Sequence, residues 1–147
     1  MAYTLIGNTP GSGDSVNGTV ATWMDLLTPA TSNGIIKQAQ CYCALSTNVK
    51  FKIFKDGGTT WVYVTESRVC AAVSGLNTFD IWLPVTVGDY LAIYYDTANS
   101  VNRLASGSAT TLAGDVTTTQ NKTSWTAASR TQLIQGLVFS MNKPIII

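Results

Sequence analysis

The sequence predicts an all-β protein, specifically a jelly-roll or Greek-key β-sandwich with about eight to ten short strands. Most apolar residues alternate with polar ones at a spacing of two, and no segment of ordinary helix length has a 3.6-residue apolar period. The composition agrees, because only 12% of the residues are charged and 46% are hydrophobic, while Thr, Ser, Gly and Asn are plentiful. At 147 residues we expect a single domain over residues 1–147.

The N-terminal part is expected to supply an arm and two strands. Residues 3–6 are a short apolar piece, and the turn-rich NTPGSGDS that follows indicates an N-terminal arm of about residues 1–15 that contacts a neighbouring subunit. Residues 16–27 alternate as one half-buried strand. After a loop, residues 35–45 form a second strand, with Ile35, Cys41 and Leu45 on its inner face.

A hairpin follows. Residues 49–55 place Phe51 inward, and Lys50 and Lys52 point outward, a pattern that protects an exposed strand edge. Asp56-Gly57-Gly58 supplies the positive-φ positions of a tight turn, and residues 59–65 return as the partner strand. A short strand is expected at residues 69–73.

The strongest strand pattern runs over residues 76–96. Apolar residues alternate up to Leu83, and after the connection at residues 84–89 they alternate again from Leu91 to Tyr95. We expect two core strands joined through a corner.

The remaining chain changes character. Residues 97–132 contain 14 Ser or Thr and only scattered apolar residues, so we expect an exposed excursion with short strands near 101–105 and 116–119. Residues 133–141 are nearly continuously apolar and predict a central strand. A C-terminal tail of about residues 142–147 is expected to make inter-subunit contacts.

The sequence argues against several classes of protein. It contains no histidine, the commonest general base, and its carboxylates form no evident pair, so we expect no enzyme. No cofactor or metal site is indicated. The net charge of +1 predicts no nucleic-acid partner, and the absence of a secretory signal or an apolar span predicts no membrane partner and synthesis in a host cytoplasm. Cys41, Cys43 and Cys70 are expected to be buried free thiols, although a bond from Cys70 to one of the others stays open.

Aromatic residues offer the candidates for binding. Trp61 and Tyr63 share one strand face, and Trp125 lies in the polar excursion, where it is expected to be the most exposed. Such rings can stack on sugars, but the favoured interpretation is that Trp23, Trp61, Tyr63 and Trp82 pack in a core or a subunit interface.

The run FDIWLPVTVGDYLAIYY resembles a segment of many jelly-roll modules, in which a strand passes through a Gly-Asp corner into an apolar strand. Gly88 and Asp89 are the positions that carry this resemblance. Trimeric domains of the tumour-necrosis-factor and complement-like type are similar here, as are phage capsid decoration proteins and tail-fibre tips. The opening MAYTLIG and the weakly charged, Thr-rich composition also resemble phage virion proteins. The resemblance implies a homotrimer packed through apolar or aromatic sheet faces.

We therefore expect a non-enzymatic virion structural protein of a tailed bacteriophage. It would be a capsid decoration or cement protein that binds itself and the major capsid protein or another virion protein, bridging capsomers. Ile145, Ile146 and Ile147 are the expected clamp, because exposed isoleucines are costly unless covered. The alternative is a glycan- or receptor-binding module of a tail fibre, or a carbohydrate-binding domain, acting through Trp61, Tyr63 and Trp125.

Overall fold

The computed structural model describes residues 2–140, which are almost entirely strands and connecting turns. The strands are β1 (Tyr3–Gly7), β2 (Ser15–Val16), β3 (Ala21–Asp25), β4 (Gly34–Cys43), β5 (Thr47–Asp56), β6 (Thr60–Glu66), β7 (Cys70–Ala72), β8 (Gly75–Val85), β9 (Tyr90–Tyr95), β10 (Asn102–Leu104), β11 (Ala109–Ala113), β12 (Gln120–Asn121), β13 (Thr126–Ala128), β14 (Thr131–Gln132) and β15 (Ile134–Ser140). A 3-10 helix, η1 (Lys122–Ser124), lies between β12 and β13. Within the described part, no helix has the length and apolar character needed to cross a membrane.

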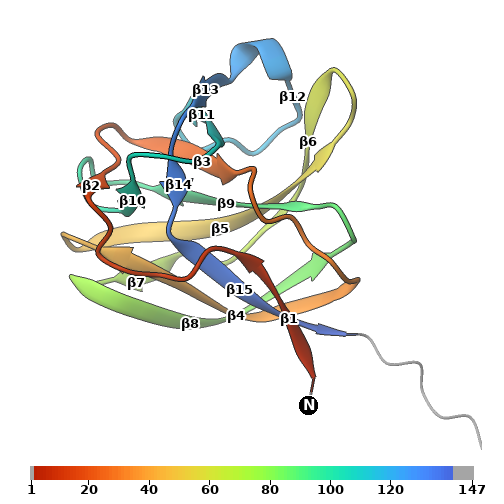
Figure 1. The fold of residues 1–147 in the computed structure, drawn as a ribbon, viewed down its shortest axis with the longest axis horizontal. Helices are drawn as coiled ribbons and strands as arrows, with labels where there is room; N and C mark the ends of the chain where they lie inside the picture. The colour runs from red at the N-terminus through yellow and green to blue at the C-terminus, as the bar shows by residue number, and fades with distance from the viewer. Residues whose placement is uncertain (1, 141–147) are drawn as a thin grey trace, which may run out of the picture.

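The strand pairings are those of a jelly roll, which confirms the predicted fold class. Antiparallel pairs nest inside one another: β1 with β15, β3 with β9, β4 with β8, and β5 with β6. The result is a four-stranded sheet in the order β1-β15-β4-β8 and a larger sheet in the order β12-β6-β5-β9-β3-β11-β13, with β7 also paired to β5. Figure 1 shows the smaller sheet lying beneath the larger one.

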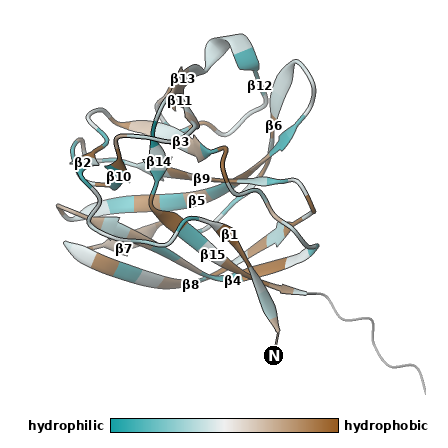
Figure 2. Ribbon diagram, viewed as in Figure 1, coloured by the Kyte–Doolittle hydropathy of each residue, from teal (hydrophilic) through white to brown (hydrophobic). Residues whose placement is uncertain are grey.

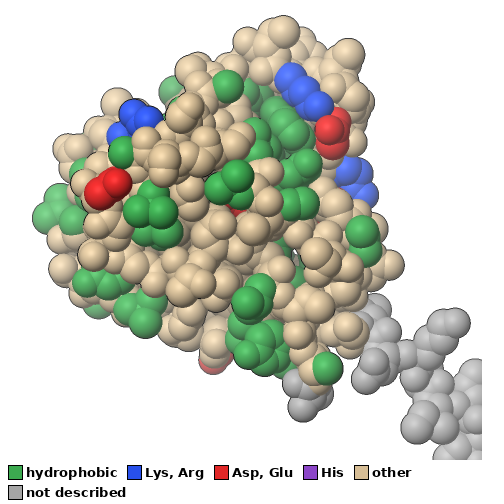
Figure 3. Space-filling model, viewed as in Figure 1, with side chains coloured by type: hydrophobic (Ala, Val, Ile, Leu, Met, Phe, Trp, Pro, Cys, Tyr) green, Lys and Arg blue, Asp and Glu red, His purple; other side chains and the backbone are tan. Residues whose placement is uncertain are grey.

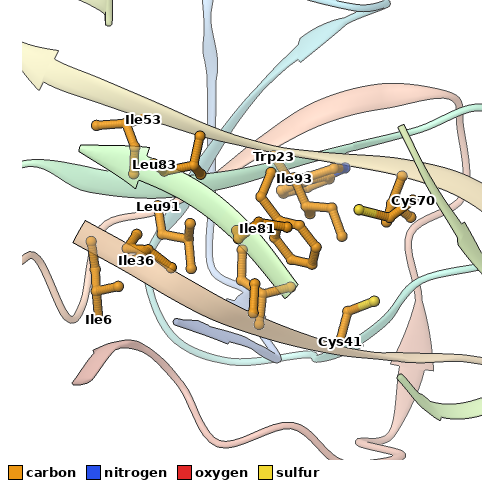
Figure 4. Packing of buried hydrophobic residues seen from close by; sticks show 14 of the residues in the cluster. Ile6, Trp23, Ile36, Cys41, Ile53, Cys70, Ile81, Leu83, Leu91 and Ile93 are labelled. Atoms are coloured by element: carbon orange, nitrogen blue, oxygen red, sulfur yellow. The ribbon is translucent and has the colours of Figure 1, made fainter. Parts of the chain in front are cut away.

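The main core fills the space between these two sheets. Ile36 and Leu83 from the small sheet meet Ile53, Leu91 and Ile93 from the large one, and all five are buried (Figure 4). The strands therefore alternate between hydrophilic and hydrophobic residues along their length (Figure 2), as expected when one face of a strand packs on a core. Cys41, Cys43 and Cys70 are free and buried, which confirms the favoured prediction.

A second core lies on the other face of the large sheet. The helix η1 joins β12 to β13, the two end strands of this sheet, so the sheet curls over its own outer face. Met24, Phe54, Trp61, Val116 and Trp125 are buried inside the curl. The polar excursion thus acts as a cover, and the expectation that it is exposed is wrong for Val116 and Trp125.

The stretch 76–96 forms β8, the corner and β9, as predicted. The corner carries the chain from the small sheet to the large one, since β8 pairs with β4 while β9 pairs with β3 and β5. Gly88 adopts a positive φ of 89°, and the buried Asp89 carboxylate accepts a hydrogen bond from the Thr86 backbone N–H at 2.9 Å. The side chain of Asp89 is therefore part of the turn.

Other boundaries differ from the prediction. Residues 16–27 are two strands, β2 and β3, and β3 is buried on both faces because the two cores lie on either side of it. A bulge around Lys37 changes the parity of β4, so Ile36 points into the core, and Leu45 lies outside the strand and is exposed. The hairpin at 56–58 is confirmed, with Gly58 at a φ of 86°.

The structure also differs from the sequence-based prediction at two strands that were expected to lie at or beyond a sheet edge. β5 is not an exposed edge, because β9 pairs with one side of it and β6 and β7 pair with the other. Lys50 and Lys52 therefore do not protect an edge. At the N-terminus, residues 3–7 pair with β15 and form the edge strand of the small sheet rather than a free arm. Contacts of the arm with a neighbouring subunit stay a prediction, and the predicted C-terminal tail lies outside the described residues.

Candidate functional site

The aromatic residues expected to bind a ligand are largely covered. Trp125 is 6% exposed and Trp61 is 8% exposed, so the expectation that Trp125 is the most accessible ring is wrong. Trp125 packs edge-to-face on Phe54, with ring centroids 5.3 Å apart. The Lys122 ammonium lies 4.4 Å from the centre of the Trp61 ring. Tyr63 is partly exposed, and Ile145, Ile146 and Ile147 lie outside the described residues.

The exposed aromatic residues lie instead on the outer face of the small sheet. Trp82 of β8 is 64% exposed and Tyr3 of β1 is 52% exposed. Phe139 of β15 lies beside Tyr3, with ring centroids 5.8 Å apart. The Lys37 ammonium of β4 contacts the rings of both neighbouring strands, at 5.5 Å from the centre of the Phe139 ring and 5.7 Å from the centre of the Trp82 ring. We call Tyr3, Phe139, Lys37 and Trp82 the aromatic row; it crosses all four strands.

The backbone explains this alignment. Tyr3 is directly opposite Phe139 in the antiparallel register of β1 and β15, which brings their rings together. Trp82 lies between Ile81 and Leu83, both of which point into the main core, so the alternation of the strand turns Trp82 outward. The bulge in β4 turns Lys37 to the same face. The period-two pattern around Trp82 was the available sequence signal, but the favoured interpretation placed this ring in a core or an interface.

Apolar side chains extend this face toward both edges. Leu5 of β1 and Leu76 of β8 are exposed. A surface hollow of about 540 Å³ lies along the edge strand β1, and Leu5 and Leu27 are among its lining residues. The outer face of the small sheet is therefore a candidate contact surface rather than a catalytic cleft.

A second candidate is a cluster of four charged side chains inside the curl of the large sheet. Lys50 and Lys52 are on β5, Glu66 ends β6, and Asp115 follows β11. The Lys52 side chain has no exposed surface, and its Nζ donates to Glu66 Oε1 at 2.7 Å, to Asp115 Oδ1 at 2.5 Å and to the Val116 carbonyl at 2.8 Å. We call Lys50, Lys52, Glu66 and Asp115 the charged cluster.

Lys50 completes the charged cluster. Its Nζ donates to Glu66 Oε2 at 3.1 Å and to Asp115 Oδ2, so all four carboxylate oxygens are bonded to ammonium groups. The Lys52 ammonium also lies 5.6 Å from the ring of Tyr63 and 5.9 Å from the ring of Tyr94. A hollow of about 250 Å³, lined in part by Lys50, Tyr94 and Asp115, opens beside the cluster.

The electrostatics of the cluster favour ionised groups. Partial burial opposes the charge on Glu66 and Asp115, but hydrogen bonds from the two lysines outweigh it and hold the pKa of both carboxyls below their ordinary values. Burial likewise opposes the charge on Lys50, yet its hydrogen bonds to Asp115 and Glu66 raise its pKa. Burial, reinforced by the nearby Glu66 carboxylate, raises the pKa of Tyr63 to about 12.

The charged cluster was not predicted from the sequence. Glu66 and Asp115 are 49 positions apart in the chain, and no local pattern indicates that the excursion carries Asp115 back over β5. Both carboxylates are ion-paired with lysines, so neither one is an unpaired general acid or base in the cluster as the structure shows it. Among residues 2–140, no group of three or more Cys, Asp or Glu side chains is arranged to hold a metal ion.

Comparison with family models, with curated proteins and with solved structures gives no match to this chain.

Proposed function

We propose that the protein is a non-enzymatic structural protein of a tailed-phage virion, a decoration or cement subunit that forms a homotrimer and binds the major capsid protein. The observation that carries the proposal is the exposed aromatic row on the small sheet. Large exposed apolar patches on soluble proteins mark contact surfaces, and aromatic residues are the usual anchors of such contacts.

The size of this surface suits a protein interface. Each large aromatic side chain covers about 150–250 Å² when buried. Tyr3, Phe139 and Trp82 therefore supply the apolar centre of an interface of standard size, about 800 Å² per partner, with Leu5 and Leu76 toward its margins. Lys37 fits the same role, since its aliphatic stem covers apolar surface while its ammonium contacts both flanking rings.

The charge distribution supports a contact made by shape and apolar burial. The net charge is +1, and the face of the molecule in Figure 3 carries few charged side chains among mainly uncharged polar atoms and scattered hydrophobic groups. Long-range electrostatic attraction would therefore contribute little to binding. The neutralised carboxylates of the charged cluster support the non-enzymatic part of the proposal.

Sedimentation velocity of the purified chain tests self-association. We expect a trimer, and we expect Trp82→Ala to weaken association at least tenfold, because interface anchors typically cost about 2 kcal/mol or more when truncated. Leu45→Ala is the matched control, since Leu45 is an exposed apolar side chain outside the row. A wild-type chain that stays monomeric at all accessible concentrations would contradict the proposal.

Particle composition tests the virion assignment. Peptide mass spectrometry of purified virions of the phage that encodes the chain should find it in fixed ratio to the major capsid protein. Purified trimer added to particles lacking the chain should bind them and delay their thermal rupture. A chain absent from virions, or one that does not bind such particles, would exclude the decoration role.

The second candidate is a glycan-binding module of a tail fibre or a carbohydrate-binding domain, and the exposure of Trp82 favours it. A hollow of about 320 Å³ beside this ring is lined by polar groups that include Glu66, Arg68 and Asp80. A ring to stack on a sugar and polar groups to bind its hydroxyls are the usual elements of such a site. On a glycan array, binding that Trp82→Ala abolishes and Leu45→Ala leaves intact would support this candidate.

A further inference from the structure

We propose that the charged cluster is a covalent cross-linking site, in which the Lys52 amine condenses with the Asp115 carboxyl to form an intramolecular isopeptide bond. The proposal rests on the geometry around Lys52 and is independent of the aromatic row. It would join the centre of the large sheet to the excursion that covers it.

The geometry brings the two reacting groups close together. Lys52 Nζ lies 2.5 Å from Asp115 Oδ1, and the carbonyl oxygen and nitrogen of one amide are about 2.25 Å apart, as the C=O and C–N bond lengths require. To react, the nitrogen leaves this hydrogen-bonding position and approaches the adjacent carbon, Asp115 Cγ, to which Oδ1 is bonded. Lys52 is held by β5 and by its bonds to Glu66 and to the Val116 carbonyl, which limits its freedom to leave this position.

The reaction needs no outside reagent. A proton moves along the hydrogen bond from the Lys52 ammonium to the Asp115 carboxylate, which gives a neutral amine and a carboxylic acid. The nitrogen lone pair forms the new C–N bond at Asp115 Cγ. Glu66 takes the second proton from this nitrogen and delivers it to the departing hydroxyl, the C–O bond breaks, and one water leaves. One cation and one anion are consumed together, so Lys50 and Glu66 remain as a balanced ion pair.

The surroundings favour this condensation over its reverse in water. Groups held in reactive geometry react as if at effective concentrations of about 10⁵–10⁸ M. The Lys52 side chain has no exposed surface, which limits the access of water to the new bond from that side, while the Asp115 side chain is 31% exposed. Lys50 is the less suitable nucleophile, because its side chain is 15% exposed and water can solvate its charge.

The test is the intact mass of the denatured, purified full-length chain. We expect it to be lower than the sequence mass by one water, and trypsin should release peptide 51–55 joined to peptide 104–122, because an acylated Lys52 is not cleaved. An unchanged mass after prolonged incubation at neutral pH would overturn the proposal. A cross-link that maps to Lys50 instead of Lys52 would also overturn it.

Variants separate the roles. Asp115→Asn should form the same amide and lose one ammonia, while Asp115→Ala should lose nothing. Glu66→Gln removes the proton carrier and should slow the bond by about 10²–10⁴-fold, the usual contribution of a positioned acid or base. Lys50→Arg keeps a positive charge beside the carboxylates and should retain the bond. Loss of water from Asp115→Ala, or loss of the bond in a folded Lys50→Arg, would refute the assignment.

Discussion

Replacing Trp125 with alanine tests whether the excursion is a structural cover. Trp125 is buried against Phe54 in the second core. A large aromatic side chain removes about 150–250 Å² from water, so at about 25 cal/mol per Å² the burial of Trp125 stabilises the fold by about 4–6 kcal/mol. This is an upper bound, because unfolded chains already bury some apolar surface. The indole Nε1 is also buried without a hydrogen-bond partner among the described residues, a cost of about 1–3 kcal/mol that the substitution relieves.

We therefore expect Trp125→Ala to lower the free energy of unfolding by about 3 kcal/mol. Urea denaturation followed by far-ultraviolet circular dichroism measures this loss without relying on tryptophan fluorescence. Trp82→Ala is the matched control, because that ring is 64% exposed, and at concentrations where the chain is monomeric it should change stability by about 0.5 kcal/mol or less. Equal losses in the two variants, or a loss below about 1 kcal/mol for Trp125→Ala, would refute the second core.

Three further substitutions or conditions test particular contacts. Gly58 has a φ of 86°, so Gly58→Ala should lower the free energy of unfolding, measured by urea denaturation, by about 1 kcal/mol. Gly11 has no positive φ, and a Cβ added there meets no atom within 4 Å, so Gly11→Ala should leave stability nearly unchanged. Lys52→Met leaves Glu66 and Asp115 with only one lysine and should lower the free energy of unfolding by about 3 kcal/mol. Lys55 is exposed, so Lys55→Met should lower it by about 1 kcal/mol or less. Similar urea midpoints for the two variants would contradict the burial of Lys52. The folded-state pKa of Glu66 lies below its ordinary value of 4.5, so its stabilising contribution is complete above that value and is lost as the pH falls through the folded-state pKa. The urea midpoint should therefore decrease between about pH 7 and about pH 3, and Glu66→Gln should make this dependence on pH weaker. If the midpoint of Glu66→Gln depends on pH as strongly as that of the wild type, the ion pairs of Glu66 with Lys50 and Lys52 are contradicted.

The jelly roll was predictable because its main strands alternate locally. Residues 79–83 and 91–95 place every second side chain in one core, and the turn at Gly88 and Asp89 marks the corner between them. The strand count was too low, since β10 to β14 in the excursion are two to five residues long and pair mostly with distant segments. Strands of this length have too few residues to show a period.

The positions of Lys52 and Trp125 were not predictable for a related reason. Alternation shows which side of a strand a residue faces, but it does not show whether another segment covers that side. Lys52 faces away from the main core, as predicted, yet Asp115 and Val116 cover it completely. Trp125 has polar neighbours in sequence, which favoured exposure, but its own ring fills the space above Phe54. Lys52 and Trp125 were both expected to be exposed, and both are buried because the excursion packs over the outer face of the large sheet.

The most direct test of the proposed function is hydroxyl-radical footprinting of the aromatic row at increasing protein concentration. We predict that oxidation of Trp82 and Tyr3 falls as the chain assembles, while oxidation of Leu45 stays constant. If sedimentation shows assembly and Trp82 remains as reactive as in the monomer, the aromatic row is not the interface and the proposed basis of the structural role is wrong.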